Sequence, residues 1–155
     1  SIVENLGQRL RDVMAELRPP MLDDYGLAAT LRWVGRRFAD RSGLTVRVRA
    51  KEPEPRLPPA VETTLLRVAQ EALTNVEKHA RGEHATVTLH ATRRLVRLTV
   101  SDDGRGFAVD RRIAATNGGG WGIVGMRERV QSLGGRFRVE AEPDRGTRVI
   151  AELER

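Results

Sequence analysis

Short runs in which apolar and polar residues alternate are the feature that most limits how this chain can fold. Five such runs occur, at residues 44–50, 85–91, 95–101, 136–142 and 147–154. An alternating strand buries one face of its sheet and leaves the other face in water. The pattern therefore predicts a two-layer α/β sandwich, with a mixed sheet and helices on one face, rather than a doubly wound parallel sheet.

Apolar spacings of three and four predict the helices. They fall at about 27–41, at about 60–80, and from 123 to a cap at Gly134 and Gly135. The first residues of the chain show the same spacing, which fits a packed bundle or an amphipathic helix on the domain's own core. Because proline cannot continue a helix interior, RPPMLDDYG at residues 18–26 is predicted to be a connector.

Composition excludes several classes of protein. The 155 residues suffice for one well-buried domain. They include no cysteine, which excludes disulfides and cysteine-bound zinc, and no run of about 18 apolar residues that could cross a membrane. The net charge of +6 would attract nucleic acid, anionic lipid, nucleotide phosphates or an acidic protein, and charge alone does not choose among them.

The helix expected over 60–80 has two distinct faces. Its apolar arc, at about 100° per residue, comprises Leu65, Leu66, Ala69, Ala72, Leu73, Val76 and Ala80. Glu71, Asn75 and Lys78 fall on the opposite side. One interpretation is a solvated polar face, with Arg67 and Glu71 as a surface ion pair.

Asn75 favours a second interpretation of that face. Asparagine is a mediocre helix former, but its amide oxygen can ligate Mg²⁺, an ion that shares oxygen ligands with phosphates. Glu71 would then serve as a proton acceptor and Lys78 as a phosphate clamp. His79 would reach the same phosphates, although a structural histidine is the alternative.

The stretch VSDDGRGF, residues 100–107, closes an expected strand with two carboxylates and two glycines. No GxxxxGK[ST] phosphate loop is present in the chain. A carboxylate would repel a triphosphate, whereas it accepts a hydrogen bond from the exocyclic amine of adenine. We therefore expect Asp102 to recognise the base while Gly104 and Gly106 let the backbone turn around the ring. A simple turn after the strand is the alternative.

The phosphates would then need a separate site. The stretch NGGGWGIVGM, residues 117–126, places several glycines before a helix start. Free amides at a helix N-terminus bind anions, helped by the helix dipole. Gly120, Gly122 and Gly125 are therefore candidate phosphate contacts, and a linker between elements is the alternative.

These motifs resemble a known superfamily. Three motifs carry the resemblance, in the order Glu71-x-x-x-Asn75-x-x-Lys78-His79, DDGRGF at 102–107 and GWGIVGMRERV at 120–130. They resemble the N, G1 and G2 boxes of the gyrase, chaperone, histidine-kinase and mismatch-repair ATPases. More narrowly, they resemble the catalytic domain of two-component sensor histidine kinases of the subclass paired with helix-turn-helix response regulators. ELRPPMLDDYGLAATLRWV, residues 16–34, resembles that subclass's join between dimerisation bundle and catalytic domain.

The resemblance implies a Bergerat-type fold that binds ATP and Mg²⁺. Asn75 would ligate the Mg²⁺ ion, and Glu71 matches the position of the superfamily's general base. The remaining implied ATP contacts are Lys78 and His79 near the phosphates, Asp102 on the adenine amine, Gly104 and Gly106 in the pocket floor, and Thr147 near the adenine through the Asp102 network.

The resemblance also implies a division of the chain. Residues 1–20 would be the C-terminal part of the second helix of the dimerisation bundle, and residues 21–155 the catalytic ATP-binding domain, with an ATP lid at about 109–122. The family's phosphoacceptor histidine lies on the bundle's first helix, whereas the histidines here are His79, His84 and His90. We therefore expect this protein histidine kinase fragment to bind ATP without phosphorylating itself.

The implied partners follow from the same family. They are the protein's own dimerisation bundle with its phosphoacceptor histidine, a second copy in a homodimer of the full-length protein, and a response regulator, with no nucleic acid. The implied location is cytoplasmic, with any membrane anchor of the parent protein outside this stretch.

Two alternative functions remain at this point. An anti-sigma-factor-type serine kinase shares the ATP boxes but lacks the preceding helix and the LRPP join. A basic nucleic-acid-binding module is supported by the net charge and by TRRLVR at 92–97. However, aromatic residues make up only 4% of the chain, and no stacking motif or recognition helix is evident.

Overall fold

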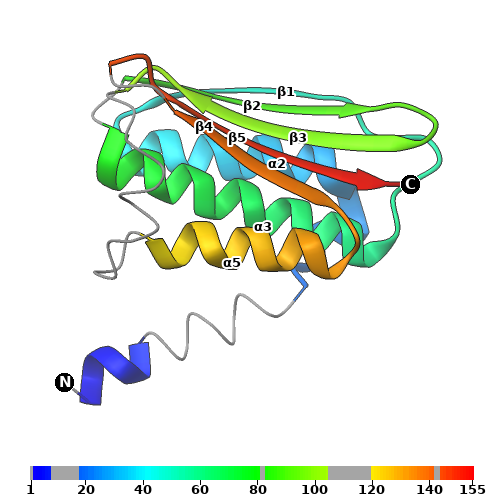
Figure 1. Ribbon diagram of the computed structural model, residues 1–155, viewed down its shortest axis with the longest axis horizontal. Helices are drawn as coiled ribbons and strands as arrows, with labels where there is room; N and C mark the ends of the chain where they lie inside the picture. The colour runs from blue at the N-terminus through cyan, green and yellow to red at the C-terminus, as the bar shows by residue number, and fades with distance from the viewer. Residues whose placement is uncertain (1, 8–17, 81–82, 105–119, 142–143) are drawn as a thin grey trace.

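The computed structural model describes residues 2–7, 18–80, 83–104, 120–141 and 144–155. Its sheet has the strand order β1-β2-β3-β5-β4. The strands are β1 (Thr45–Ala50), β2 (His84–Ala91), β3 (Leu95–Asp102), β4 (Arg136–Ala141) and β5 (Thr147–Glu154). β1 runs parallel to β2, and the other neighbours are antiparallel. Helices lie along one face of this sheet (Figure 1), so the predicted two-layer mixed sandwich is confirmed.

The two faces of the sheet differ as the alternation predicts. In β3, Val96, Leu98 and Val100 are buried against the helices, whereas Arg97 between them is exposed. The core consists of these inward residues together with the apolar arcs of the helices. None of the helices in the described part of the chain is long and apolar enough to cross a bilayer.

Helix α2 (Pro20–Ser42) begins earlier than predicted. Pro20 occupies its first turn, where proline's missing N–H has no helical partner to lose and its fixed φ suits a helix. The prediction of a connector over 18–26 was therefore wrong for residues 20–25. Gly26, with φ 84° and ψ 174°, breaks the helix there, and Gly43 ends it in a left-handed conformation.

Helix α3 (Pro59–Asn75) is followed directly by a π-helical turn, η1 (Val76–Ala80). The predicted apolar arc is buried from Leu65 to Val76. The uniform helix predicted over 60–80 was wrong in one respect, because its last five residues follow the wider π geometry. Short π-helical segments are rare and frequently occur at functional sites.

Helix α5 (Gly120–Ser132) starts three residues before the predicted position, so residues 120–122 of the predicted lid are helical. Ile123, Met126 and Val130 are buried on its inner side. The predicted cap is confirmed, since Gly134 and Gly135 donate their N–H groups to the carbonyls of Gln131 and Val130.

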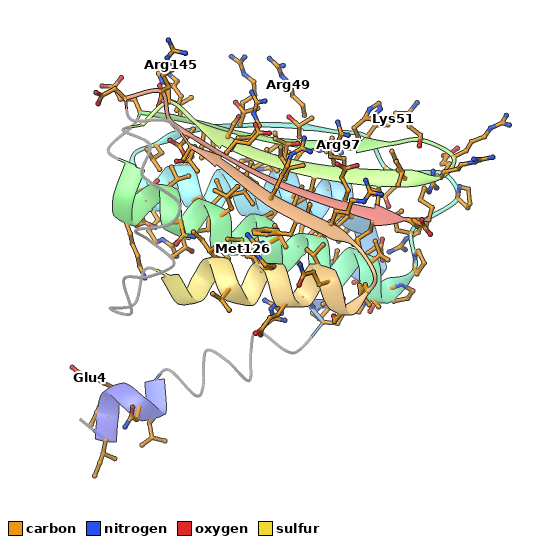
Figure 2. The ribbon with its side chains drawn as sticks, viewed as in Figure 1. Glu4, Arg49, Lys51, Arg97, Met126 and Arg145 are labelled. Carbon is orange, nitrogen blue, oxygen red and sulfur yellow. The ribbon has the colours of Figure 1, made fainter. Side chains whose placement is uncertain are left out.

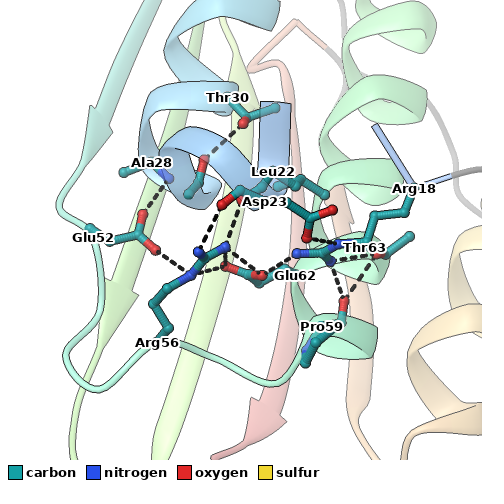
Figure 3. Close-up of polar contacts among 11 residues, drawn as sticks. Arg18, Leu22, Asp23, Ala28, Thr30, Glu52, Arg56, Pro59, Glu62 and Thr63 are labelled. Atoms are coloured by element: carbon teal, nitrogen blue, oxygen red, sulfur yellow. Dashed lines mark hydrogen bonds and ion pairs between the residues drawn. The ribbon is translucent and has the colours of Figure 1, made fainter. Parts of the chain in front are cut away.

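A buried carboxylate joins the start of α3 to the segment before α2 (Figure 3). Glu62 is only 1% exposed, and it accepts hydrogen bonds from Arg18 at 2.7 Å and from Arg56 at 3.1 Å. Arg18 also donates to Asp23 at 2.7 Å, and Arg56 donates to the carbonyl of Leu22 at 2.6 Å. Two guanidinium groups therefore satisfy the one buried acid of this cluster.

Candidate functional site

The elements that carry the described site residues meet at one end of the domain. The π-helical turn ends at Ala80, and β2 begins four residues later at His84. In the sheet register, Ala85 lies opposite Asp102 at the end of β3. The end of α3, the start of α5 and the β4–β5 turn lie together at this end (Figure 1). Residues 27 positions apart in sequence, Asn75 and Asp102, are thus brought to the same end.

The two adjacent aspartates of the DDG stretch have different environments. Alternation along β3 puts Asp102 on the side of Val96, Leu98 and Val100, which is the side covered by helices. One of its carboxylate oxygens, Oδ1, accepts the backbone N–H of Gly104 at 2.8 Å, a bond that tightens the turn after the strand. Asp102 is partly exposed and Gly104 is buried. The aspartate that faces the helical layer is therefore the predicted adenine-binding residue.

Asp103 instead fastens β3 to the start of β2. Its Oδ1 accepts the backbone N–H groups of Glu83 and His84 at 3.0 and 2.9 Å, and its Oδ2 lies 2.8 Å from Nδ1 of His84. The backbone hydrogen bond from His84 is the largest of the effects that lower the pKa of Asp103 below its usual value. Asp103 is thus occupied by protein donors and has a structural role.

The turn between β4 and β5 packs closely against Asp102. Gly146 has a φ of +81°, and an added Cβ there would collide with the carbonyl oxygen of Asp102. Thr147, predicted to lie near Asp102, follows at once as the first residue of β5. Both residues line a cavity of about 240 Å³, but Ser101 and Arg148 on the outer face of the sheet line it too. The residues that line this cavity come from both faces of the sheet and from the β4–β5 turn, and none of them belongs to a helix.

The polar residues at the end of α3 have no partners of their own in the described part of the chain. Glu71 and Asn75 are partly exposed and Lys78 is exposed. None of the three side chains forms a hydrogen bond or an ion pair with a described residue. Arg67, the predicted partner of Glu71, donates to Oε1 of Gln70 at 2.9 Å. Asn75 is the last residue of α3 before the π-helical turn, so Lys78 follows a different geometry from the one that the sequence periodicity assumed.

Glu71 lies against the first turn of α5. An added Cβ at Gly122 would overlap Oε1 of Glu71 and lie 3.1 Å from its carboxyl carbon. A side chain at Gly122 would therefore require the end of the Glu71 side chain to move. At Gly125 an added Cβ would meet nothing within 4 Å, so no such movement is needed there. The two glycines, predicted together as phosphate contacts, therefore differ in their surroundings.

Several predicted residues lie wholly or partly outside the described residues. Gly106 and most of the predicted lid are among them. Gly120 begins α5 and His79 belongs to the π-helical turn, but their side-chain surroundings are not described. Within the described ranges, no group of three or more His, Asp or Glu side chains could hold a metal ion.

Sequence reasoning missed the Glu62 cluster, although a signal was present. Glu62 precedes Leu65, Leu66 and Ala69 by three, four and seven residues, so helical periodicity places it on the buried arc. A charged residue at such a position needs a buried partner. Its partners Arg18 and Arg56 lie 44 and 6 positions away.

Two histidine kinases are similar in sequence to most of this chain. The chain is 33% identical over 144 residues to the signal transduction histidine-protein kinase/phosphatase DegS of Brevibacillus brevis, covering 93% of this chain and 36% of DegS. It is 34% identical over 152 residues to the oxygen sensor histidine kinase NreB of Staphylococcus carnosus, covering 98% of this chain and 43% of NreB. The chain thus spans less than half the length of these relatives.

Solved structures show the same fold. The blue-light activated histidine kinase EL346 of Erythrobacter litoralis matches with a TM-score of 0.67 and 24% identity, over 82% of this chain and 41% of that one. The full-length ShkA structure in complex with AMPPNP matches with a TM-score of 0.64 and 23% identity, over 83% of this chain and 29% of that one. At these identities the likeness shows the fold alone.

A family model connects the fold with the motifs. The model described as histidine kinase-, DNA gyrase B- and HSP90-like ATPase matches residues 60–155, which include α3, the DDGRGF stretch and α5. The match extends over more than half of the chain. The chain therefore belongs to the histidine kinase-, DNA gyrase B- and HSP90-like ATPase family, as the ATP-binding catalytic domain of a sensor histidine kinase.

Proposed function

We propose that this domain binds ATP with Mg²⁺ at the end of α3 and transfers the γ-phosphoryl group to a histidine on the dimerisation bundle of its parent protein. The observation that carries the proposal is the set of polar side chains without partners at that end. Buried or half-buried polar groups usually find hydrogen-bond partners. Glu71, Asn75 and Lys78 find none among the described residues, although Asn75 is only partly exposed. A polar ligand would supply the missing interactions.

The donor set suits Mg²⁺ with a nucleotide. Mg²⁺ is commonly bound through one or two protein oxygens together with substrate phosphates and water. Asn75 offers one amide oxygen, and no other protein cage is present among the described residues. Asn75 would therefore hold the ion, which would neutralise phosphate charge.

Other residues of the chain would bind the adenine and the phosphates. The carboxylate of Asp102 would accept a hydrogen bond from the adenine amine, with the Gly104 turn and Thr147 beside it. Lys78, with His79, would place positive charge near the phosphates, and Glu71 would take up a proton. The amides at the start of α5, from Gly120 to Gly125, would face the phosphates, and residues 109–119 would complete the lid. In phosphoryl transfer such positioning and charge neutralisation supply most of the catalysis.

The biological setting is also a proposal. The catalytic domain would occupy residues 21–155 and follow the end of a dimerisation helix at 1–20, in a homodimer of the cytoplasmic part of the parent. The phosphoryl group would pass on to a response regulator with a helix-turn-helix output domain. The kinase names of DegS and NreB support this assignment.

Calorimetric titration with an adenine nucleotide, with and without Mg²⁺, tests the binding site. We expect Mg²⁺-dependent binding that Asp102→Asn weakens at least about tenfold, because the amide presents a donor where the adenine amine needs an acceptor. Asn75→Asp should disturb the Mg²⁺ dependence. Asp103→Asn is the matched control and should leave the affinity unchanged. Equal affinities of the Asp102→Asn variant and the unmodified chain would refute the assignment of the base contact.

Labelling with γ-labelled ATP tests the phosphoryl transfer. The chain should take up no label alone, because its three histidines lie outside residues 1–20. It should label an added fragment that carries the parent's complete dimerisation bundle, in an acid-labile linkage. Acid-labile label on the chain itself would contradict the proposed division of the protein.

A further inference from the structure

The outer face of the sheet, the face without helices, carries all six strand arginines. Figure 2 shows Arg49, Lys51, Arg97 and Arg145 projecting from the sheet on the side away from the helices. The exposed arginines on outward positions of the strands are Arg47, Arg49, Arg97, Arg136, Arg138 and Arg148. The carboxylates at outward strand positions are Glu140, Glu152 and Glu154, and Asp103, directly after β3, is bound to the outward His84.

The sheet register spreads these charges across all five strands. One row runs from Arg47 through Thr86 and Ser101 to Arg148 and Glu140. The next row runs from Arg49 through Thr88 and Thr99 to Ile150 and Arg138. With neighbouring strands about 4.8 Å apart, the rows cover a surface about 19 Å wide. The arginines therefore form a broad array instead of one compact pocket.

The positive charges are only partly neutralised. Arg97 pairs with Glu152 at 3.3 Å, and Arg138 and Arg148 lie 3.2 and 3.8 Å from Glu140. Arg47, Arg49 and Arg136 form no ion pair with any described residue. All three glutamates belong to β4 and β5, so the outward positions of β1, β2 and β3 carry no carboxylate. The half of the face next to the β1 edge is accordingly the more basic half.

Most of the uncharged residues of this face are threonines and serine, with no Phe, Trp or Tyr among the outward strand positions. The exceptions are His84 and His90, which are exposed, and Leu95 at the start of β3, which is 41% exposed. Ile150 points outward yet is only 4% exposed, and it lies opposite Arg138 in the register. Long arginine side chains can cover an apolar neighbour in this way while their charged ends stay in water.

We propose that this basic outer face docks on an anionic lipid bilayer. A bilayer with anionic headgroups is a broad surface of phosphates, and it attracts basic residues without requiring a shaped pocket. Arginine suits this role because its planar guanidinium binds phosphate oxygens in pairs. The breadth of the array and its excess of arginine match such a partner.

Other polyanions fit this face less well. Single-stranded nucleic acid is bound on aromatic platforms, and this face has none. Duplex DNA is read by a helix or a two-stranded ribbon that enters a groove, which a five-stranded face does not provide. Protein interfaces have cores enriched in aromatic residues and methionine, whereas Ile150 is the one outward aliphatic residue near the centre of these rows.

Docking through this face would leave the proposed nucleotide site accessible. Asp102 lies on the helix-covered side of β3, and Glu71 and Asn75 belong to a helix of that layer. The inference is independent of the proposed kinase function, because it concerns the opposite face of the sheet.

Co-sedimentation of the purified chain with vesicles tests the proposal. The probes are vesicles of phosphatidylcholine alone and vesicles with about one third phosphatidylglycerol. We expect binding to the anionic vesicles at low salt, loss of that binding at 0.5 M salt by screening, and no binding to neutral vesicles. The variant R47Q/R49Q/R136Q removes three arginines without ion-pair partners, so its melting temperature should be unchanged.

A matched variant separates the outer face from net charge. R36Q/R37Q/R41Q removes the same charge from exposed positions of α2 in the helical layer. At roughly fivefold for each arginine near an anionic surface, R47Q/R49Q/R136Q should weaken vesicle binding about 100-fold and the α2 variant much less. Equal losses in the two variants, no binding to anionic vesicles, or tighter binding to a duplex DNA that depends on the same three arginines would each overturn the proposal.

Discussion

The two ends of helix α3 treat their polar residues in opposite ways. At the first turn, Glu62 is buried and receives hydrogen bonds from both Arg18 and Arg56. At the last turn, Glu71 and Asn75 are partly exposed and have no partner among the described residues. The polar group in the first turn of α3 is thus bound by other protein residues, whereas the polar groups in its last turn are available to a ligand.

The difference shows how to separate structural from functional polar residues. A charge that is buried and fully paired contributes to the folded state, and removing its partners is costly. A half-buried polar group without a partner contributes little to folding and is available to a ligand. Asp103, which is held by the backbone N–H groups of Glu83 and His84, belongs with the paired structural residues.

The largest expected effect comes from removing the buried acid. Glu62→Ala should lower the free energy of unfolding by about 3–5 kcal/mol, because Arg18 and Arg56 then lose the charge that they enclose. Asn75→Ala, at the other end of α3, should change it by no more than about 0.5 kcal/mol. Urea denaturation of both variants measures these changes. Similar losses of unfolding free energy in the two variants would contradict the difference between the two ends of α3.

A smaller effect is expected from each arginine of the cluster. Arg18→Gln and Arg56→Gln should each cost about 2 kcal/mol, since either leaves Glu62 one charged hydrogen-bond partner. The double variant should lose more than the sum of the single losses, because it leaves the carboxylate unpaired. The control is Arg41→Gln, whose ion pair with Glu77 is 3.5 Å long and exposed and should contribute little. Additive losses would show that the two arginines act separately.

At the other end of α3, packing between helices can be tested at Gly122. Gly122→Ala should be less favourable than Gly125→Ala by up to about 1 kcal/mol, because both gain helix propensity but only the methyl group at 122 has to displace the Glu71 carboxylate. In a Glu71→Ala background the two substitutions should change stability equally. The same difference between the two substitutions in both backgrounds would mean that Glu71 is not the obstacle.

The smallest expected effect concerns Asp103 and pH. Its folded-state pKa is lowered, so its contribution to stability is fully present above its unfolded pKa and disappears as pH falls through the folded value. The carboxylate is about half exposed, which limits that contribution to less than about 1 kcal/mol. Urea denaturation should show Asp103→Asn as less stable at pH 6, with the gap closing below about pH 3.8. A gap that widens toward acid would contradict the direction of the shift.

Much of the fold could be predicted because it depends on local patterns. Alternation located the five strands, and Gly134 and Gly135 located the end of α5. Pro20 misled the prediction because a proline that stops one helix looks the same as a proline in the first turn of the next. The π-helical turn after Asn75 was not predicted, because the periodicity argument assumed α-helical geometry throughout.

The residue types of the candidate site could be predicted from the sequence, but the contacts that each residue makes could not. Residue spacing singled out Asn75 and Asp102, but only the strand register brings their elements to the same end of the domain. The contact between Gly122 and Glu71 joins residues 51 positions apart, which no local pattern reports. Long-range contacts of this kind determine which polar groups are already occupied.

The parallel pairing of β1 with β2 has a consequence for the order in which the sheet opens. Thr45 of β1 pairs with His84 of β2, and the whole of α3 lies between these two residues in the sequence. By contrast, a tight turn joins Ala91 of β2 to Val96 of β3. β1 is also an edge strand with a single neighbour. Amide protons of β1 should therefore exchange with deuterated solvent well before those of β3, and the chain should recover this strand last on refolding.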